Sequence, residues 1–208
     1  MAEQDERSAL LSALTTEHFV LQTANNSTYA EASSRSTLYV MVLSSALVAT
    51  GFVAGSTDVL LPFIAIVLPA VFLLGAFTVV RLVDTALESR YCLRGIARIR
   101  AHYRTLGPAA ARYFSPESGR WPEGQAVALR FGAGLAFLGT TASMVAVINN
   151  VVAGVGIALL MLFLCPGAPA WGGVAAGVAG ALLLTVLFYA YQRWRFEDDD
   201  RSVDSRKG

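Results

Sequence analysis

Charged residues are scarce in this chain, and they are absent from three long stretches. Asp, Glu, Lys and Arg make up 15% of the 208 residues, whereas soluble domains carry about 25%. Hydrophobic residues make up 55%, and the mean hydropathy is +0.53. The net charge of +1 gives no electrostatic case for nucleic-acid binding. Because so little polar surface is available, we expect a membrane protein that lies in a lipid bilayer.

Residues that carry out catalysis or bind metals are equally sparse. The two histidines, His18 and His102, are isolated, and no His/Glu pair has metalloprotease spacing. The two cysteines, Cys92 and Cys165, do not form a four-cysteine metal pattern. The sequence contains no Walker loop and no Gly-x-Ser-x-Gly elbow. We therefore expect a protein that is not an enzyme and that has no cofactor and no metal site.

Two of the uncharged stretches have the length of a membrane-spanning helix. A helix rises about 1.5 Å per residue, so about 20 residues cross a hydrocarbon core of about 30 Å. Arg35 and Asp58 enclose 22 uncharged residues, and Asp58 and Arg81 enclose another 22. The turn between these stretches is short. They predict two spans within residues 37–80 that form a tight hairpin.

The third uncharged stretch is too long for a single span. Residues 131–192 carry no formal charge, and as a straight helix they would extend over about 93 Å. A Pro- and Gly-rich loop at residues 165–171 divides the stretch and predicts a last span after it. Asn149 and Asn150 interrupt the part before the loop. That part predicts either one long, tilted helix or two pieces, of which the second is re-entrant.

The basic residues predict the orientation, because positive charge stays on the cytoplasmic side of a membrane. Residues 81–130 carry nine arginines and the residues after 192 carry five basic side chains, whereas the two short loops carry none. Both basic regions then lie on one side. We predict an all-α polytopic protein of the bacterial inner membrane, with four transmembrane helices in two hairpins and both termini in the cytoplasm. A further break at Asn149 and Asn150 would give five spans and export the tail.

This topology divides the chain into five parts. We expect a cytoplasmic N-terminal helix, a first transmembrane hairpin, a cytoplasmic basic helix with its loop, a second transmembrane hairpin and a disordered cytoplasmic tail. In that order the parts are residues 1–36, 37–80, 81–128, 129–192 and 193–208.

The first part shows apolar residues at helical spacing and then turns small and polar over residues 22–37. Small polar residues are typical either of close packing against another helix or of a solvated linker, and the sequence leaves both interpretations open.

The segment 84–106 combines an apolar face with a stripe of arginines. Arg90, Arg94 and Arg98 follow one another at intervals of four residues, and Arg104 is near. This pattern predicts an amphipathic cytoplasmic helix that continues from the second span. The arginines are candidate contacts for anionic lipid headgroups or for an anionic ligand such as a nucleotide phosphate. They also fit the ordinary excess of positive charge on the inner side.

Polar residues inside the predicted spans are the candidates for a polar path. Asn149 and Asn150 lie deep in an apolar run, and Thr141 and Ser143 precede them. Buried amides of this kind line water, sit at an interface or bond across helices. No Asp, Glu, Lys or Arg lies inside a predicted span, which disfavours a proton-coupled exporter.

Glycines spaced four residues apart are candidates for helix packing. They form two pairs, Gly51 with Gly55 and Gly173 with Gly177. Such ridges let helix backbones approach closely in lipid, either within one chain or between copies. We expect the protein to form a homo-oligomer.

The layout as a whole resembles that of two groups of bacterial membrane proteins. Three segments, residues 21–26 (Leu-Gln-Thr-Ala-Asn-Asn), 31–39 (Glu-Ala-Ser-Ser-Arg-Ser-Thr-Leu-Tyr) and 94–100 (Arg-Gly-Ile-Ala-Arg-Ile-Arg), resemble uncharacterised small multi-pass membrane proteins of actinobacteria. More loosely, residues 8–107 are similar in layout to transmembrane effectors of nucleotide-signalled antiphage systems. Those effectors are thought to perforate the inner membrane, so the resemblance implies a role in antiviral defence.

Three functions are compatible with these features. The first is an oligomeric pore or membrane-perturbing effector in which the arginine stripe senses a lipid or a partner. The second is a membrane scaffold or subunit that recruits a cytoplasmic protein or an anionic ligand through residues 1–36 and 84–126. The third is a small-molecule exporter, which the lack of charge within the spans disfavours.

Overall fold

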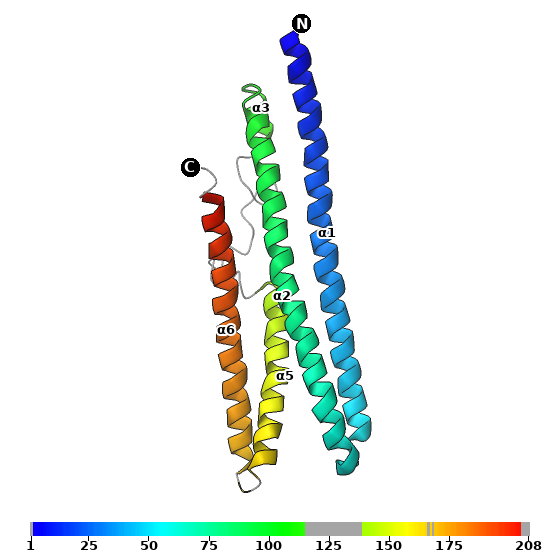
Figure 1. Cartoon of the computed structure of the whole chain (residues 1–208). Helices are drawn as coiled ribbons and strands as arrows, with labels where there is room; N and C mark the ends of the chain where they lie inside the picture. Colours follow the sequence, from blue (N-terminus) through cyan, green and yellow to red (C-terminus); the bar gives the residue numbers. More distant parts are fainter. Residues whose placement is uncertain (1, 115–138, 166, 168, 205–208) are drawn as a thin grey trace. The chain divides into compact units, whose positions relative to one another are not determined.

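The structure, a computed structural model, describes residues 2–114, 139–165, 167 and 169–204 (Figure 1). These residues are almost entirely helical and contain no strand, which confirms the predicted all-α class. The helices of this described part are α1 (Ala2–Val53), α2 (Thr57–Arg104), α3 (Ala110–Tyr113), α5 (Thr141–Leu164) and α6 (Ala170–Asp204).

Four of the described helices are long and apolar enough to cross a membrane, namely α1, α2, α5 and α6. This confirms the predicted number of candidate spans. Many of their large apolar side chains are exposed; Phe52 of α1, for example, is 86% exposed and Phe77 of α2 is 73% exposed. A water-soluble protein rarely exposes so much apolar surface. These faces therefore suit lipid rather than water as the solvent.

The chain folds into two compact units, each drawn from separate stretches of sequence. We call the first the basic unit; its described residues are 2–32 and 84–114. The second, the apolar unit, comprises the described residues of 33–83 and 138–208. Each of the long helices α1 and α2 contributes one end to each unit.

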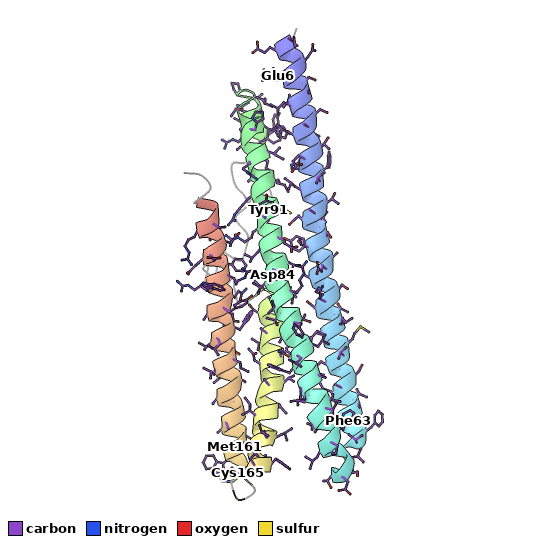
Figure 2. All side chains as sticks on the ribbon, in the orientation of Figure 1. Glu6, Phe63, Asp84, Tyr91, Met161 and Cys165 are labelled. Carbon is purple, nitrogen blue, oxygen red and sulfur yellow. The ribbon has the colours of Figure 1, made fainter. Side chains whose placement is uncertain are left out.

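In the apolar unit, α5 and α6 pack closely against each other through glycines. They are joined by a short connection next to Met161 and Cys165, which Figure 2 labels. A Cβ atom added to Gly154 would lie 2.6 Å from the carbonyl oxygen of Gly177, and one added to Gly173 would lie 2.8 Å from Cγ of Leu162. No side chain fits at such separations. The glycines therefore set the distance between the two helices.

Helix α5 also contacts the first two helices of the apolar unit. A Cβ atom on Gly156 would lie 2.6 Å from Cδ2 of Leu68 in α2. Near the other end of α5, the side chain of Asn149 lies against Gly75 of α2 and beside Tyr39 of α1. Helix α5 is thus the element that α1, α2 and α6 share within this unit.

In the basic unit, α1 and α2 lie antiparallel along one seam. The contacts pair Thr15 with Tyr103 and Asn25 with Ser89, so positions rise along α1 as they fall along α2. The seam residues follow at alternating steps of three and four, as in a coiled coil. On α1 they are Leu11, Leu14, His18, Leu21, Asn25 and Thr28, and on α2 they are Thr85, Ser89, Cys92, Ile96, Ile99 and Tyr103, all buried or half-buried.

The polar stretch that follows residue 22 packs within its own chain. Asn25 and Thr28 are buried, and the Ser89 hydroxyl donates a 2.7 Å hydrogen bond to Oδ1 of Asn25. Nearby, a Cβ atom on Gly95 would lie 2.7 Å from Cδ1 of Leu21, so the two helices approach closely there. Of the two interpretations left open by the sequence, the structure shows close helix packing at these positions.

Helix α5 passes through Asn149 and Asn150 without a break. It begins after Thr140, whose side-chain oxygen accepts a 3.2 Å hydrogen bond from the backbone N–H of Ser143, a common way of capping a helix. The two asparagines lie within the helix, and each has a hydrogen-bond partner on another helix. The first part of the predicted long helix, residues 131–138, lies outside the described residues.

The end of the chain differs from the sequence prediction. Residues 193–208 were expected to be disordered, whereas α6 continues as helix to Asp204. Extending an existing helix needs no new nucleation, so polar residues are readily added to it. The guanidinium of Arg193 donates a 2.6 Å hydrogen bond to the Glu197 carboxylate one turn later, which favours this extension.

Candidate functional site

Three helices of the apolar unit meet at Asn149. The Tyr39 hydroxyl of α1 donates a 3.3 Å hydrogen bond to Oδ1 of Asn149 on α5. Both residues are buried, with exposed fractions of 0% and 3%. A Cβ atom at Gly75 of α2 would overlap the Asn149 side chain, so only glycine leaves room for the amide. The asparagine therefore connects α5 with α1 by a hydrogen bond and packs against α2 at Gly75.

Two further polar contacts join α5 to α6. Nδ2 of Asn150 donates a 3.1 Å hydrogen bond to the Thr185 hydroxyl. The Ser143 hydroxyl donates a 3.4 Å hydrogen bond to Oε1 of Gln192, which is only 1% exposed. A buried amide in an apolar environment is costly unless it is hydrogen-bonded, and these partners meet that need.

The polar residues predicted to line a path therefore lie at helix contacts. The structure brings Asn149, Asn150 and Ser143 onto the sides of α5 that face other helices. Thr141 is exposed and does not join them. Within the described residues these three side chains bond to partners on other helices, which is a use of polar groups typical of packing in membranes.

The two predicted glycine pairs have different surroundings. Gly173 and Gly177 lie in the contact with α5, close to Ala158 and Gly154. Gly51 lies near the end of α1 and Gly55 in the turn that follows it, and each has open space where a Cβ atom would lie. The first pair packs within the chain, whereas the second pair is uncovered and its two members do not share one helix.

The four candidate arginines do not form one surface. Arg90 and Arg94 are half-buried and each interacts with other residues, whereas Arg98 is exposed. Arg104 is half-buried, and it lies about 120° around the helix from Arg98. Its Nε atom is buried and has no hydrogen-bond partner among the described residues.

A cavity of about 550 Å³ lies in the basic unit. It is formed by α1, by the end of α2 and by the short helix α3 with the residue after it. Most of its wall is apolar or aromatic, and its basic groups come from α1 and α2. The lining residues are Thr15, His18, Phe19, Arg100, Tyr103, Leu106, Tyr113 and Phe114.

Hydrogen bonds and ring contacts hold this wall together. The Thr15 hydroxyl donates to the Leu11 carbonyl at 2.9 Å, so the Tyr103 hydroxyl, 3.2 Å away, is the donor in the contact with Thr15. The Tyr103 and Phe114 rings lie with their centroids 5.1 Å apart. Tyr103 thereby connects α1 with the segment that follows α2.

The electrostatics of the cavity are set by His18 and Arg100. Burial lowers the pKa of His18, and the nearby Arg100 guanidinium lowers the pKa further. Nδ1 of His18 is buried without a hydrogen-bond partner among the described residues. The cavity therefore presents a neutral imidazole next to a permanent positive charge.

Sequence reasoning missed this constellation. His18 was treated as an isolated histidine, and Arg100 falls outside the stripe of arginines at four-residue intervals. The available signal was Arg100, outside the stripe, together with a histidine on the apolar face of the first helix. That signal points to a site only when the two helices are known to be antiparallel partners.

A second hollow of the basic unit offers less chemistry. It is lined by Cys92, Glu31 and Glu88 among other residues and has a volume of about 400 Å³. Burial raises the pKa of the Cys92 thiol, and the Glu88 carboxylate raises the pKa further, so the thiol is a poor nucleophile.

Within the described residues, no group of three His, Cys, Asp or Glu side chains lies close enough to hold a metal ion. Comparison with protein-family models, with curated proteins and with solved structures gives no match. The functional conclusion therefore depends on the two units themselves.

Proposed function

We propose that this protein is a multi-pass protein of the bacterial inner membrane that acts as a scaffold for a cytoplasmic partner. In this proposal α1 with α2 and α5 with α6 form two transmembrane hairpins. The basic unit and both termini lie in the cytoplasm, and the connection between α5 and α6 lies outside. The nine arginines of residues 81–130 and the lack of basic residues in the short connections support this orientation.

The observation that carries the scaffold role is the exposed apolar surface of the basic unit. Phe19 is 62% exposed, Tyr91 is 60% exposed and Tyr113 is 83% exposed, and Figure 2 labels Tyr91 on α2. These residues lie outside the charge-free stretches. For this part of the chain water is the expected solvent. Exposed aromatic side chains on such a surface mark sites of protein contact.

The apolar unit supports an anchor rather than a conduit. Its buried amides are hydrogen-bonded across helices, and its charge-free stretches offer no ionisable relay for coupled transport. Each polar contact of this kind stabilises a membrane protein by only about 0.6 kcal/mol on average, which is enough to specify how helices pair.

Site-specific photocrosslinking in cells tests the scaffold role. A photoreactive amino acid at Phe19 or Tyr91 is expected to give one dominant adduct with a different protein. The same probe at Ile66 or Phe163, which are 73% and 70% exposed on the apolar unit, serves as the matched control and is expected to give no such adduct. Equal labelling at all four positions, or no protein adduct at Phe19 and Tyr91, would contradict the proposal.

One observation favours a second function, the oligomeric pore or membrane-perturbing effector. Gly51, near the end of α1, has open space where a Cβ atom would lie, and an uncovered glycine lets the helix of another copy approach closely. A pore would then form between copies, because the amides of each copy are already paired. Replacing Gly51 with leucine is expected to dissociate such an oligomer in detergent while leaving the monomer folded. Unchanged mass, together with reconstituted liposomes that stay ion-tight, would remove this function.

A further inference from the structure

The cavity between α1, α2 and α3 combines a positive charge with an aromatic wall. Arg100 supplies the charge, and no Asp or Glu is among the described residues that line the cavity. A guanidinium is permanently charged and presents its donors as a planar fork that fits a carboxylate or a phosphate. A ligand that pairs with Arg100 is therefore expected to carry an oxyanion.

A second donor lies beside Arg100. His18 lines the same cavity, and its Nδ1 atom is buried but makes no hydrogen bond within the described chain. Buried polar atoms in folded proteins are nearly always paired, so an orphaned one calls for an explanation. A turn of the imidazole ring would bring this nitrogen to an oxygen of a bound anion. The anion would also favour the protonated imidazole, which donates from both nitrogens.

The rest of the cavity fits a flat apolar body. The rings of Phe19, Tyr103, Tyr113 and Phe114, with Leu106, provide most of the wall. The volume of about 550 Å³ falls within the range of about 300–1,000 Å³ that is typical of small-molecule sites. Such sites usually combine an apolar lining with a few polar groups that orient the ligand.

We propose that this cavity binds a small organic anion, an aryl phosphate or an aryl carboxylate. Its charged group lies on Arg100 and His18, and its ring lies against Tyr103 and Phe114. This binding goes beyond the scaffold role and does not depend on it. Phe19 and Tyr113 belong to both surfaces, but the cavity takes its polar groups from Arg100 and His18, which the scaffold contact does not use. Since the wall draws on α1, α2 and α3, the bound anion also connects these three elements.

Titration calorimetry on the full chain in detergent tests the proposal. The probes are 1-naphthyl phosphate and 1-naphthoate, with 1-naphthol as the uncharged control and inorganic phosphate as the control without a ring. Saturable binding of one equivalent is expected for at least one of the two charged naphthyl probes, at least tenfold tighter than for either control, and their ratio identifies the preferred headgroup. Equal binding of 1-naphthol, or no saturable binding of any charged probe, would overturn it.

Substitutions separate this site from a general electrostatic effect. Arg100→Gln is expected to weaken binding of the charged probe at least tenfold, whereas Arg98→Gln, on the exposed side of the same helix, is expected to leave it unchanged. An equal loss in both variants would contradict a site at Arg100. Circular dichroism of both variants checks that the helices are retained.

A measurement on a chain that keeps all its arginines tests the proposal even if Arg100→Gln fails to fold. The pKa of His18 is followed by NMR of labelled histidine in a chain that carries His102→Gln, which leaves one histidine signal. The charged probe is expected to raise the pKa of His18, because the anion stabilises the imidazolium. An unchanged pKa at saturating probe would overturn the assignment of His18 to the site.

Discussion

The apolar unit and the basic unit both pack long helices, but they use polar residues in opposite ways. In the apolar unit, Asn149 and Asn150 are buried and hydrogen-bonded to Tyr39 and Thr185 on other helices. In the basic unit, His18 and Arg104 each keep a buried nitrogen without a partner in the described chain. In lipid an unpaired polar group finds no solvent partner, so amides there must be paired within the protein. The two orphaned nitrogens of the basic unit leave room for a partner from outside the described chain.

The same contrast appears in the residues that bring helices together. Glycines let α5 and α6 approach closely, where dispersion between backbones holds them. The antiparallel seam of the basic unit instead buries larger side chains such as Ile96 and Ile99, as the hydrophobic effect favours. Substitutions at these helix contacts should therefore change the free energy of unfolding by very different amounts in the two units.

The largest effect is expected at the glycine contact of the apolar unit. Gly154→Val would place a side chain against the backbone of Gly177, where nothing flexible is able to move aside. We expect a loss of about 3 kcal/mol or more in the free energy of unfolding, the upper range for overpacking. SDS-induced unfolding followed by circular dichroism measures it. Gly51→Val, in open space, is the matched control, and similar losses in both variants would contradict the packing described.

A smaller loss is expected at the Tyr39–Asn149 contact. Asn149→Leu leaves the buried Tyr39 hydroxyl without its acceptor, a cost of about 1–3 kcal/mol. Adding Tyr39→Phe removes the orphaned hydroxyl and is expected to restore part of that loss. The same unfolding assay completes a double-mutant cycle. Strictly additive effects would show that the two side chains do not interact.

The pH dependence of the basic unit is expected to be smaller still. The lowered pKa of His18 means that the unfolded chain binds the proton more readily, so folding opposes protonation. Stability is full above the unfolded pKa of about 6.5 and declines as the pH falls from there through the lowered folded value. The groups that face His18 across the cavity are Arg100, Tyr103 and Tyr113.

Thermal unfolding at pH 7.5 and pH 5.5 measures this dependence. His18→Gln is expected to reduce the difference between the two pH values, and His102→Gln serves as the control. An acid destabilisation that persists unchanged in His18→Gln would show that another group is responsible.

The smallest effect is expected at the exposed end of α6. Glu197→Gln removes the hydrogen-bonded ion pair with Arg193. The Glu197 side chain is 53% exposed and the Arg193 side chain is 80% exposed. Exposed pairs contribute little, so the unfolding midpoint should not change measurably. Faster amide hydrogen exchange after residue 193 is the expected change. A clear fall in the midpoint would indicate that this segment packs against the rest of its unit.

Much of the helical framework follows from the sequence, because charge cannot be placed in lipid. The uncharged stretches bounded by Arg35, Asp58 and Arg81 locate α1 and α2, and the Pro–Gly loop separates α5 from α6. The helical continuation of α2 to Arg104 was also predicted from its apolar periodicity. These features depend on local composition and need no knowledge of which helices are neighbours.

The remaining features depend on partners that are distant in the chain. The hydrogen-bond partner of Asn149 is Tyr39, which lies 110 positions away. The cavity needs His18 and Arg100 to face each other, which requires the register of two antiparallel helices. The difference between the pairs Gly51/Gly55 and Gly173/Gly177 likewise depends on what lies opposite them, so equal spacing in the sequence carries no information about it.

Cysteine accessibility in intact cells tests most directly whether the apolar unit spans the membrane with the basic unit on the cytoplasmic side. Cys165 is exposed at the connection between α5 and α6 (Figure 2), and a Phe19→Cys variant places a thiol on the basic unit. Both are studied with Cys92→Ser, and the Phe19→Cys chain also carries Cys165→Ser. A membrane-impermeant maleimide should label Cys165 in intact cells and the residue-19 thiol only after lysis. Labelling at position 19 in intact cells, or protection of Cys165 until lysis, would contradict the account.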